Sequence, residues 1–244
     1  MKQEIFTIKE NVPLTKDIMK MRLEGDVSEI KGPGQFVNVK LDGLFLRRPI
    51  SVCDVEGDCL TIIYKVVGKG TEKMAQMEEG TLDILTGLGN GYDLSCAGDA
   101  PLLVGGGVGV PPMYLLAKKL REEGKSIKVI LGFNTASEVF YEEEFKELGA
   151  DVKVTTVDGS YGIKGFVTKA MENMDYSYFY SCGPEAMLKS ISDISKTEGQ
   201  LSFEERMACG FGACMGCSCK TLYGDKRICK DGPVLRKEEV IWQK

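Results

Sequence analysis

Histidine is entirely missing from this chain of 244 residues. Its absence excludes Ser–His and Cys–His nucleophile pairs, because both need the imidazole as a general base. It also excludes Rieske ligation of an iron–sulfur cluster, which uses two histidines. Acid–base catalysis by histidine is excluded as well. Any chemistry of this chain must therefore depend on other side chains or on bound cofactors.

Long apolar runs are also missing. No run reaches the ~18 residues that a membrane span needs, and residues 1–10 are too mixed and polar for a secretory signal. The net charge of −5 argues against a nucleic-acid partner. Hydrophobic residues at 43% and charged residues at 27% give an ordinary globular balance, and the length fits two compact domains plus an appendage. We expect a soluble, cytoplasmic protein.

Residues 1–97 have the pattern of an antiparallel β-barrel. Short runs such as 35–41 and 60–67 alternate apolar with polar residues and are rich in β-branched side chains. Several such strands in under a hundred residues favour a barrel. A short helix is expected over residues 71–79, with Gly80 as its stop signal.

Residues 98–200 instead alternate strands with helices, which predicts a parallel sheet covered on both faces. This gives a multidomain α/β and β-barrel architecture, with residues 201–244 as a third, cysteine-rich segment. The expected strands are 102–104, 127–133, 152–157 and 176–180, and the expected helices are 113–122, 137–148, 165–171 and 185–198.

The strongest pattern in the sequence is a cysteine cluster. Cys209, Cys214 and Cys217 follow the spacing C-x4-C-x2-C, and eleven residues separate Cys217 from Cys229. This is the plant-type order of [2Fe–2S] ligands. Strands over 218–222 and 226–229, joined at Gly224-Asp225, would carry the fourth cysteine back beside the third. The alternatives are a zinc site, although zinc usually shows paired C-x2-C spacing, or inert buried cysteines.

The remaining cysteines are interpreted as structural. Cys219 lies two residues after Cys217 and is expected to be a packed neighbour, although an exchange of ligand between the two stays open. Cys53, Cys59 and Cys96 are expected to be small core residues.

Three further motifs have both a functional and a structural interpretation. The glycine loop 105–109 connects a strand to a helix and could cradle a phosphate, or could be a tight packing turn. Ser181-Cys182-Gly183-Pro184 lies at the start of another helix. Proline is common in the first turn of helices, so this motif could be purely structural. The adjacent Arg47 and Arg48 could clamp a pyrophosphate, or could be surface charges on an edge strand.

Taken in order, these motifs resemble the ferredoxin–NADP reductase superfamily over roughly residues 1–200. The resemblance implies an FAD-binding barrel followed by a nicotinamide-binding α/β domain, with Arg48 on the FAD phosphates and Ser51 near the flavin ring. The residues implied to contact FAD are Arg48, Pro49, Ile50, Ser51, Ile63, Tyr64, Lys65, Gly70 and Thr71, and those implied to face NAD are Gly106, Gly107, Gly109, Pro112, Cys182 and Gly183.

The C-terminal segment narrows the resemblance to one family within this superfamily. Residues 206–217 and 229–234 resemble the electron-transfer subunits of dihydroorotate dehydrogenase B complexes. The resemblance implies that Cys209, Cys214, Cys217 and Cys229 hold the cluster. It also implies a separate FMN-containing catalytic subunit, in a 2+2 heterotetramer, whose electrons pass to NAD in pyrimidine biosynthesis. The related subunits of sulfite reductase and of ferredoxin–NADP transhydrogenases are the alternative family.

A cluster carries one electron at a time, whereas NAD takes a hydride, so FAD would be the junction between them. NADH should be preferred to NADPH, because residues 132–138 contain no Arg or Lys to meet a 2′-phosphate. Two other classes remain open: a self-contained diaphorase that needs no partner, and a non-enzymatic redox sensor that needs no flavin.

Overall fold

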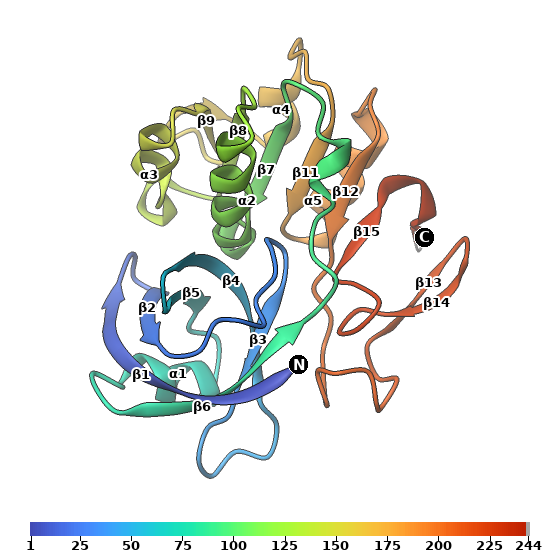
Figure 1. Ribbon diagram of the computed structural model, residues 1–244. Helices are drawn as coiled ribbons and strands as arrows, with labels where there is room; N and C mark the ends of the chain where they lie inside the picture. Colours follow the sequence, from blue (N-terminus) through green and yellow to red (C-terminus); the bar gives the residue numbers. More distant parts are fainter. Residues whose placement is uncertain (243–244) are drawn as a thin grey trace.

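The first six strands close into an antiparallel barrel, as expected (Figure 1). Residues 1–242 are described in this computed structural model. Apolar side chains at every second position of the strands fill the barrel. Along the fifth strand, Leu60, Ile62 and Tyr64 are buried inside it. The strands are β1 (Lys2–Pro13), β2 (Ile18–Glu24), β3 (Phe36–Val39), β4 (Arg48–Glu56), β5 (Cys59–Lys65) and β6 (Thr81–Leu88), paired in the order β1-β2-β5-β4-β3-β6. The predicted helix is the shorter α1 (Lys69–Ala75).

The second region is a sheet of seven strands in the order β10-β9-β8-β7-β11-β12-β15. All pairs are parallel except the last, where β15 runs antiparallel to β12. Because β15 comes from the cysteine-rich segment, that segment completes one edge of the sheet. The strands are β7 (Leu102–Gly106), β8 (Lys128–Phe133), β9 (Asp151–Thr156), β10 (Ile163–Lys164), β11 (Phe179–Cys182), β12 (Gly199–Ser202) and β15 (Val234–Arg236).

Helices cover both faces of this sheet, as predicted. Helix α2 (Pro111–Glu122) and α3 (Glu142–Glu147) pack on one face, whereas α4 (Val167–Met171) and α5 (Glu185–Ile194) pack on the other. The long helix expected over 137–148 was wrong. A 3-10 turn, η3 (Ala136–Glu138), is separated from α3 by a segment whose last residue, Tyr141, has a left-handed backbone with φ 66°. Burial of the aromatic rings of Phe140 and Tyr141 takes precedence over helix continuity there.

The third region is built on a small hairpin of β13 (Ser218–Thr221) and β14 (Gly224–Arg227). Its turn lies at residues 222–223, so the turn predicted at Gly224-Asp225 was two residues late. In Figure 1 this region, coloured red, lies beside both the barrel and the sheet. None of the helices in residues 1–242 combines the length and apolar character needed to cross a membrane.

The barrel and the sheet region are held together by α2, which packs on β4. Lys118 of α2 places its Nζ 2.8 Å from both carboxylate oxygens of Asp54 on β4, with side chains only 18% and 12% exposed. Leu115 of the same helix joins the barrel core. A partly buried ion pair beside apolar packing fixes the two regions against each other.

Candidate functional site

The four predicted ligand cysteines form two pairs. Cys209 lies beside Cys214, and Cys217 and Cys229 pack together in one buried cluster. The hairpin brings about the second pair, since the backbone N–H of Cys229 lies 3.4 Å from the sulfur of Cys217. A two-iron cluster needs two thiolates for each iron, and this arrangement fits that requirement. No three ligand-type side chains in residues 1–242 are arranged for a single metal ion.

Main-chain amides of the loop point at the sulfurs. The N–H of Ala213 lies 3.3 Å from Cys209 Sγ, and that of Gly216 lies 3.5 Å from Cys214 Sγ. Burial works to raise the pKa of the Cys209 thiol, but hydrogen bonds from loop amides outweigh it and lower this pKa to about 6. In contrast, burial and contact with Cys217 raise the pKa of Cys229 to about 12. The loop therefore favours the thiolate form at its exposed end.

The other cysteines differ in burial. Cys219 is half-buried on β13, and burial raises the pKa of its thiol. It packs beside the cluster pair Cys217 and Cys229 as an extra apolar neighbour. Cys53 is fully buried, as expected, whereas Cys59 and Cys96 are only partly buried, so the prediction that all three are core residues was too broad.

On the barrel, the two adjacent arginines have different surroundings. Arg47 is engaged, because its guanidinium donates to the carboxylate of Asp83 at 2.9 Å and to the carbonyl of the same residue at 3.0 Å. Within the described chain, Arg48 donates only to the main-chain carbonyls of Leu46 and Arg47. Its guanidinium packs directly over Gly70, at the start of α1. Arg48 is therefore the arginine with charge available for a phosphate.

The other candidates for FAD lie on the same part of the barrel with different exposure. Ser51 is half-buried on β4. Ile63 and Tyr64 are buried on β5, and the Tyr64 hydroxyl donates to Asn11 at 3.0 Å. Exposed Lys65 pairs with Asp17 at 3.0 Å. Thr71 is buried, and its hydroxyl accepts from the Val67 amide at 2.9 Å, which secures the start of α1.

The glycine loop and the Cys-Gly-Pro motif meet at the carboxyl edge of the sheet. Strands β7 and β11 are neighbours, with Cys182 opposite Gly105. A Cβ on Gly109 would lie 2.1 Å from the carbonyl oxygen of Cys182, so only glycine allows the two motifs to approach this closely. The order of the strands reverses between β7 and β11, since β8 to β10 are added on one side of β7 and β11 lies on the other, although the two strands are parallel. Nucleotides bind at such switch points in open α/β sheets.

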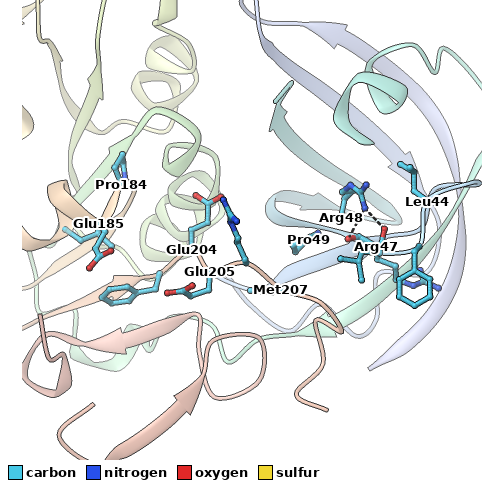
Figure 2. Close-up of a pocket in the computed structure, with 15 residues that line it drawn as sticks. Leu44, Arg47, Arg48, Pro49, Pro184, Glu185, Glu204, Glu205 and Met207 are labelled. Atoms are coloured by element: carbon cyan, nitrogen blue, oxygen red, sulfur yellow. Dashed lines mark hydrogen bonds between the residues drawn. The ribbon is translucent and has the colours of Figure 1, made fainter. Parts of the chain in front are cut away.

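A cavity of about 710 Å³ joins the three regions, within the size range of ligand pockets. In Figure 2, Arg47, Arg48 and Pro49 lie on one side, and Pro184 and Glu185 lie on the other with Glu204 and Glu205. The segment 203–207, which leads into the cysteine loop, therefore borders the same cavity as the candidate FAD and nucleotide motifs.

Sequence reasoning missed the residues that hold the cysteine loop in place. Asn38 of β3 donates from Nδ2 to the carbonyl of Cys209 at 3.3 Å. Arg227 of β14 donates to the Gly212 carbonyl at 2.9 Å and is itself held by Asp231 at 2.9 Å. A single polar residue in the apolar run 36–39 was the only sequence signal for Asn38.

The donor sets fit the groups that the motifs suggest. Paired thiols with converging amides suit an iron–sulfur cluster, which carries single electrons. An available guanidinium at a cavity edge suits a flavin nucleotide, and a glycine loop at a switch point suits a nicotinamide nucleotide. With such groups bound, one-electron and hydride chemistry would be available within one cavity.

Comparison with known protein families gives two matches. Residues 204–241 match the iron-sulfur cluster binding domain of dihydroorotate dehydrogenase B, and residues 103–193 match an oxidoreductase NAD-binding domain. A Fusobacterium nucleatum protein named dihydroorotate dehydrogenase B (NAD(+)), electron transfer subunit, is 46% identical over 98% of this chain and 99% of its own length. The protein of the same name from Bacillus pumilus is 44% identical over 98% of each chain.

Solved structures agree on the fold. A structure of NADH-dependent reduced ferredoxin–NADP oxidoreductase, studied for flavin-based electron bifurcation, superposes with a TM-score of 0.87 at 32% identity, covering 97% of this chain and 90% of that chain. The ferredoxin reductase of carbazole 1,9a-dioxygenase superposes with a TM-score of 0.67 at 19% identity, covering 79% of this chain and 64% of that chain, which supports the fold alone.

Proposed function

The chain belongs to the family of dihydroorotate dehydrogenase B electron transfer subunits, and on this premise we propose that it passes electrons from a catalytic partner to NAD. The proposed route runs from an FMN-containing partner that oxidises dihydroorotate, through a [2Fe–2S] cluster and FAD on this chain, to NAD. This chain is then an oxidoreductase subunit of pyrimidine biosynthesis.

One observation carries the proposal: the three motif regions border a single cavity. Arg48 and Pro49, Gly183, and the segment 203–207 that enters the cysteine loop all line it. Electron carriers must lie close together to exchange electrons, and the protein's part in such a reaction is to bind, orient and tune them. No acid or base residue is demanded, which is consistent with a chain that has no histidine.

We assign the cofactor contacts by the same reasoning. Arg48, whose guanidinium packs over Gly70, would neutralise the FAD pyrophosphate, and Ser51 would contact the flavin. Tyr64 is buried, so a contact from its part of β5 would come from the main chain or from Lys65. The NAD nucleotide would lie on the loops at Gly106 and Cys182, and the two thiol pairs would each hold one iron. The remaining assigned FAD contacts are Pro49, Ile50, Ile63 and Thr71; those for NAD are Gly107, Gly109, Pro112 and Gly183; and the irons would be held by Cys209 with Cys214 and by Cys217 with Cys229.

We also propose three functional domains: residues 1–97 for FAD, 98–200 for NAD and 201–244 for the cluster. Strand β12 (Gly199–Ser202) spans the second boundary, and β15 returns to the nucleotide sheet. Truncation after Glu198 would therefore remove two strands from that sheet, so it cannot test the cluster domain alone.

The partner would contact the cluster side of the molecule, in a 2+2 heterotetramer in the cytoplasm. Phe211 and Met215 of the cysteine loop are 43% and 54% exposed, and Phe45 beside the cavity is fully exposed. Substituting Phe211 by Asp should weaken partner binding without removing the cluster. The matched control is Phe166→Asp, since Phe166 is 69% exposed at the start of α4.

The deciding experiment isolates the chain from its native cells with its bound partners and assays dihydroorotate-dependent reduction of NAD. Copurification of an FMN subunit with that activity would support the proposal. An active chain with a different partner would favour the sulfite reductase or ferredoxin–NADP transhydrogenase alternative. Dihydroorotate dehydrogenase B is preferred because its named subunits match at 46% and 44% identity, against 32% for the NADH-dependent reduced ferredoxin–NADP oxidoreductase structure.

A further inference from the structure

The outer face of strand β3 is covered by the cysteine-rich region. Phe36 packs against Cys217 and Cys229, the buried thiol pair. Two residues further along, Asn38 is on the same outward face, because side chains alternate along a strand. Val37 and Val39, the residues between and after them, pack in the core of the barrel. Strand β3 is therefore where the barrel meets the cysteine loop.

Asn38 is a buried polar residue with an incomplete set of hydrogen bonds. It is 1% exposed, its Nδ2 donates to the Cys209 carbonyl at 3.3 Å, and its Oδ1 has no hydrogen-bond partner in the described chain. Burying an unsatisfied acceptor costs about 1–3 kcal/mol. A leucine would avoid that cost but would remove the hydrogen bond to the Cys209 carbonyl, so that bond is what the amide contributes here.

The fit between Asn38 and the loop is close. A Cβ on Gly210 would lie 2.3 Å from Asn38 Nδ2, and Gly210 itself has a φ of +77°. The amide of Asn38 therefore lies directly against the backbone that follows Cys209. A side chain at this position determines where that end of the loop sits relative to the barrel.

Asn38 is also the ladder partner of Pro49 in strand β4. Pro49 follows Arg48, and both border the cavity that we assign to the flavin. One hydrogen-bonded strand pair thus links this cavity to the residue that holds the Cys209 carbonyl. The connection passes from β4 to β3 and through one side-chain amide to the backbone of Cys209.

We propose that Asn38 is a positioning residue for electron transfer, which fixes the Cys209 end of the cluster loop against the flavin-binding strand. The proposal rests on the proposed function only in requiring FAD and the cluster on this chain. In the reaction to be measured, NADH is oxidised to NAD⁺ as its hydride reduces FAD. The bound flavin would then pass one of its two electrons to the oxidised cluster and keep the other.

The test uses the full chain loaded with FAD and cluster, and compares Asn38→Leu, Asn38→Asp and the control Asn90→Ala. Leucine removes the donor and keeps the bulk, whereas aspartate keeps the shape. Asn90 also joins the barrel side to the cysteine-rich segment, through hydrogen bonds of 2.8 and 3.1 Å to the backbone of Val234 and one of 3.3 Å to the carbonyl of Asp231, and none of its side-chain hydrogen bonds in the described chain goes to a ligand cysteine. Rapid mixing with NADH measures the rate of cluster reduction per iron, and electron paramagnetic resonance records the reduced cluster.

Substitution of a residue that orients a metal ligand typically costs 10–100-fold in metal affinity or activity. We expect both Asn38 variants to slow cluster reduction by roughly 10–100-fold and to shift the resonance spectrum. At a pH high enough to ionise its buried carboxyl, Asn38→Asp should also lower the cluster potential, because negative charge favours the oxidised form. Asn90→Ala should keep the wild-type rate and spectrum.

A wild-type rate and spectrum in Asn38→Leu would overturn the proposal, and so would an equal slowing in Asn90→Ala. If Asn38→Leu fails to fold or to load iron, the rate of cluster reduction and the resonance spectrum of Asn38→Asp are compared with wild type instead. These outcomes are separate from failure of the proposed function. A wild-type chain without flavin or cluster would refute that function, whereas a loaded chain with a different partner would leave the role of Asn38 intact.

Discussion

The two adjacent arginines of the barrel allow a matched test of flavin binding. Both could hold a pyrophosphate by sequence, yet only Arg48 has a guanidinium without a carboxylate partner in the described chain. Arg47 is held by Asp83, with side chains 19% and 17% exposed. We therefore predict that Arg48→Ala weakens FAD binding and that Arg47→Ala mainly lowers stability.

The magnitudes follow from the contacts. A hydrogen bond to a charged group contributes about 1.5–3 kcal/mol. Losing one such contact with the FAD phosphates should raise the FAD dissociation constant roughly 10–100-fold in Arg48→Ala, since every 1.4 kcal/mol is about ten-fold. Arg47→Ala removes the nearer of two cations from the partly buried Asp83, which keeps Lys40 at 3.6 Å and the amide of Gln3 at 2.8 Å, and this should lower the free energy of unfolding by about 1–3 kcal/mol.

The assay removes the flavin, titrates FAD back and follows quenching of flavin fluorescence, while urea unfolding of the same apoproteins measures stability. Arg48→Lys serves as a conservative variant and should recover part of the affinity, because it restores the charge without the planar fork. Equal loss of affinity in Arg47→Ala, or wild-type affinity in Arg48→Ala, would refute the division of roles between the two arginines.

Three further predictions concern the cluster, the domain contact and the nucleotide. Cys219→Ser should retain the visible absorption of the cluster, whereas Cys214→Ser should lose it; retention in both would contradict the ligand assignment. Lys118→Met should lower the free energy of unfolding by about 1–3 kcal/mol, because it leaves the carboxylate of Asp54 unpaired, and unchanged urea unfolding would show that the pair does not hold the two regions together. Steady-state rates should favour NADH over NADPH, since residues 132–138 carry no cation for a 2′-phosphate, and equal rates would reject this.

Local patterns in the sequence were enough to determine the architecture and the chemistry of the cluster. Strand alternation gave the barrel, and alternating strands and helices gave the covered parallel sheet. The spacing of Cys209, Cys214 and Cys217 predicted one loop, and the hairpin was expected to return Cys229 beside Cys217, which the structure confirms. These features depend on residues close in sequence, where periodicity and spacing are direct geometric constraints.

Only the tertiary structure decided which residues far apart in the sequence meet. Arg47 and Arg48 are adjacent in the sequence, and the fold places Arg47 against Asp83 and Arg48 against Gly70. The amide of Asn38 reaches a residue 171 positions away, and β15 returns from the cysteine-rich segment to pair with β12 in the large sheet. Such contacts depend on which faces pack together. Which faces pack together depends on the burial of side chains over the whole chain, so it cannot be read from any short stretch of sequence.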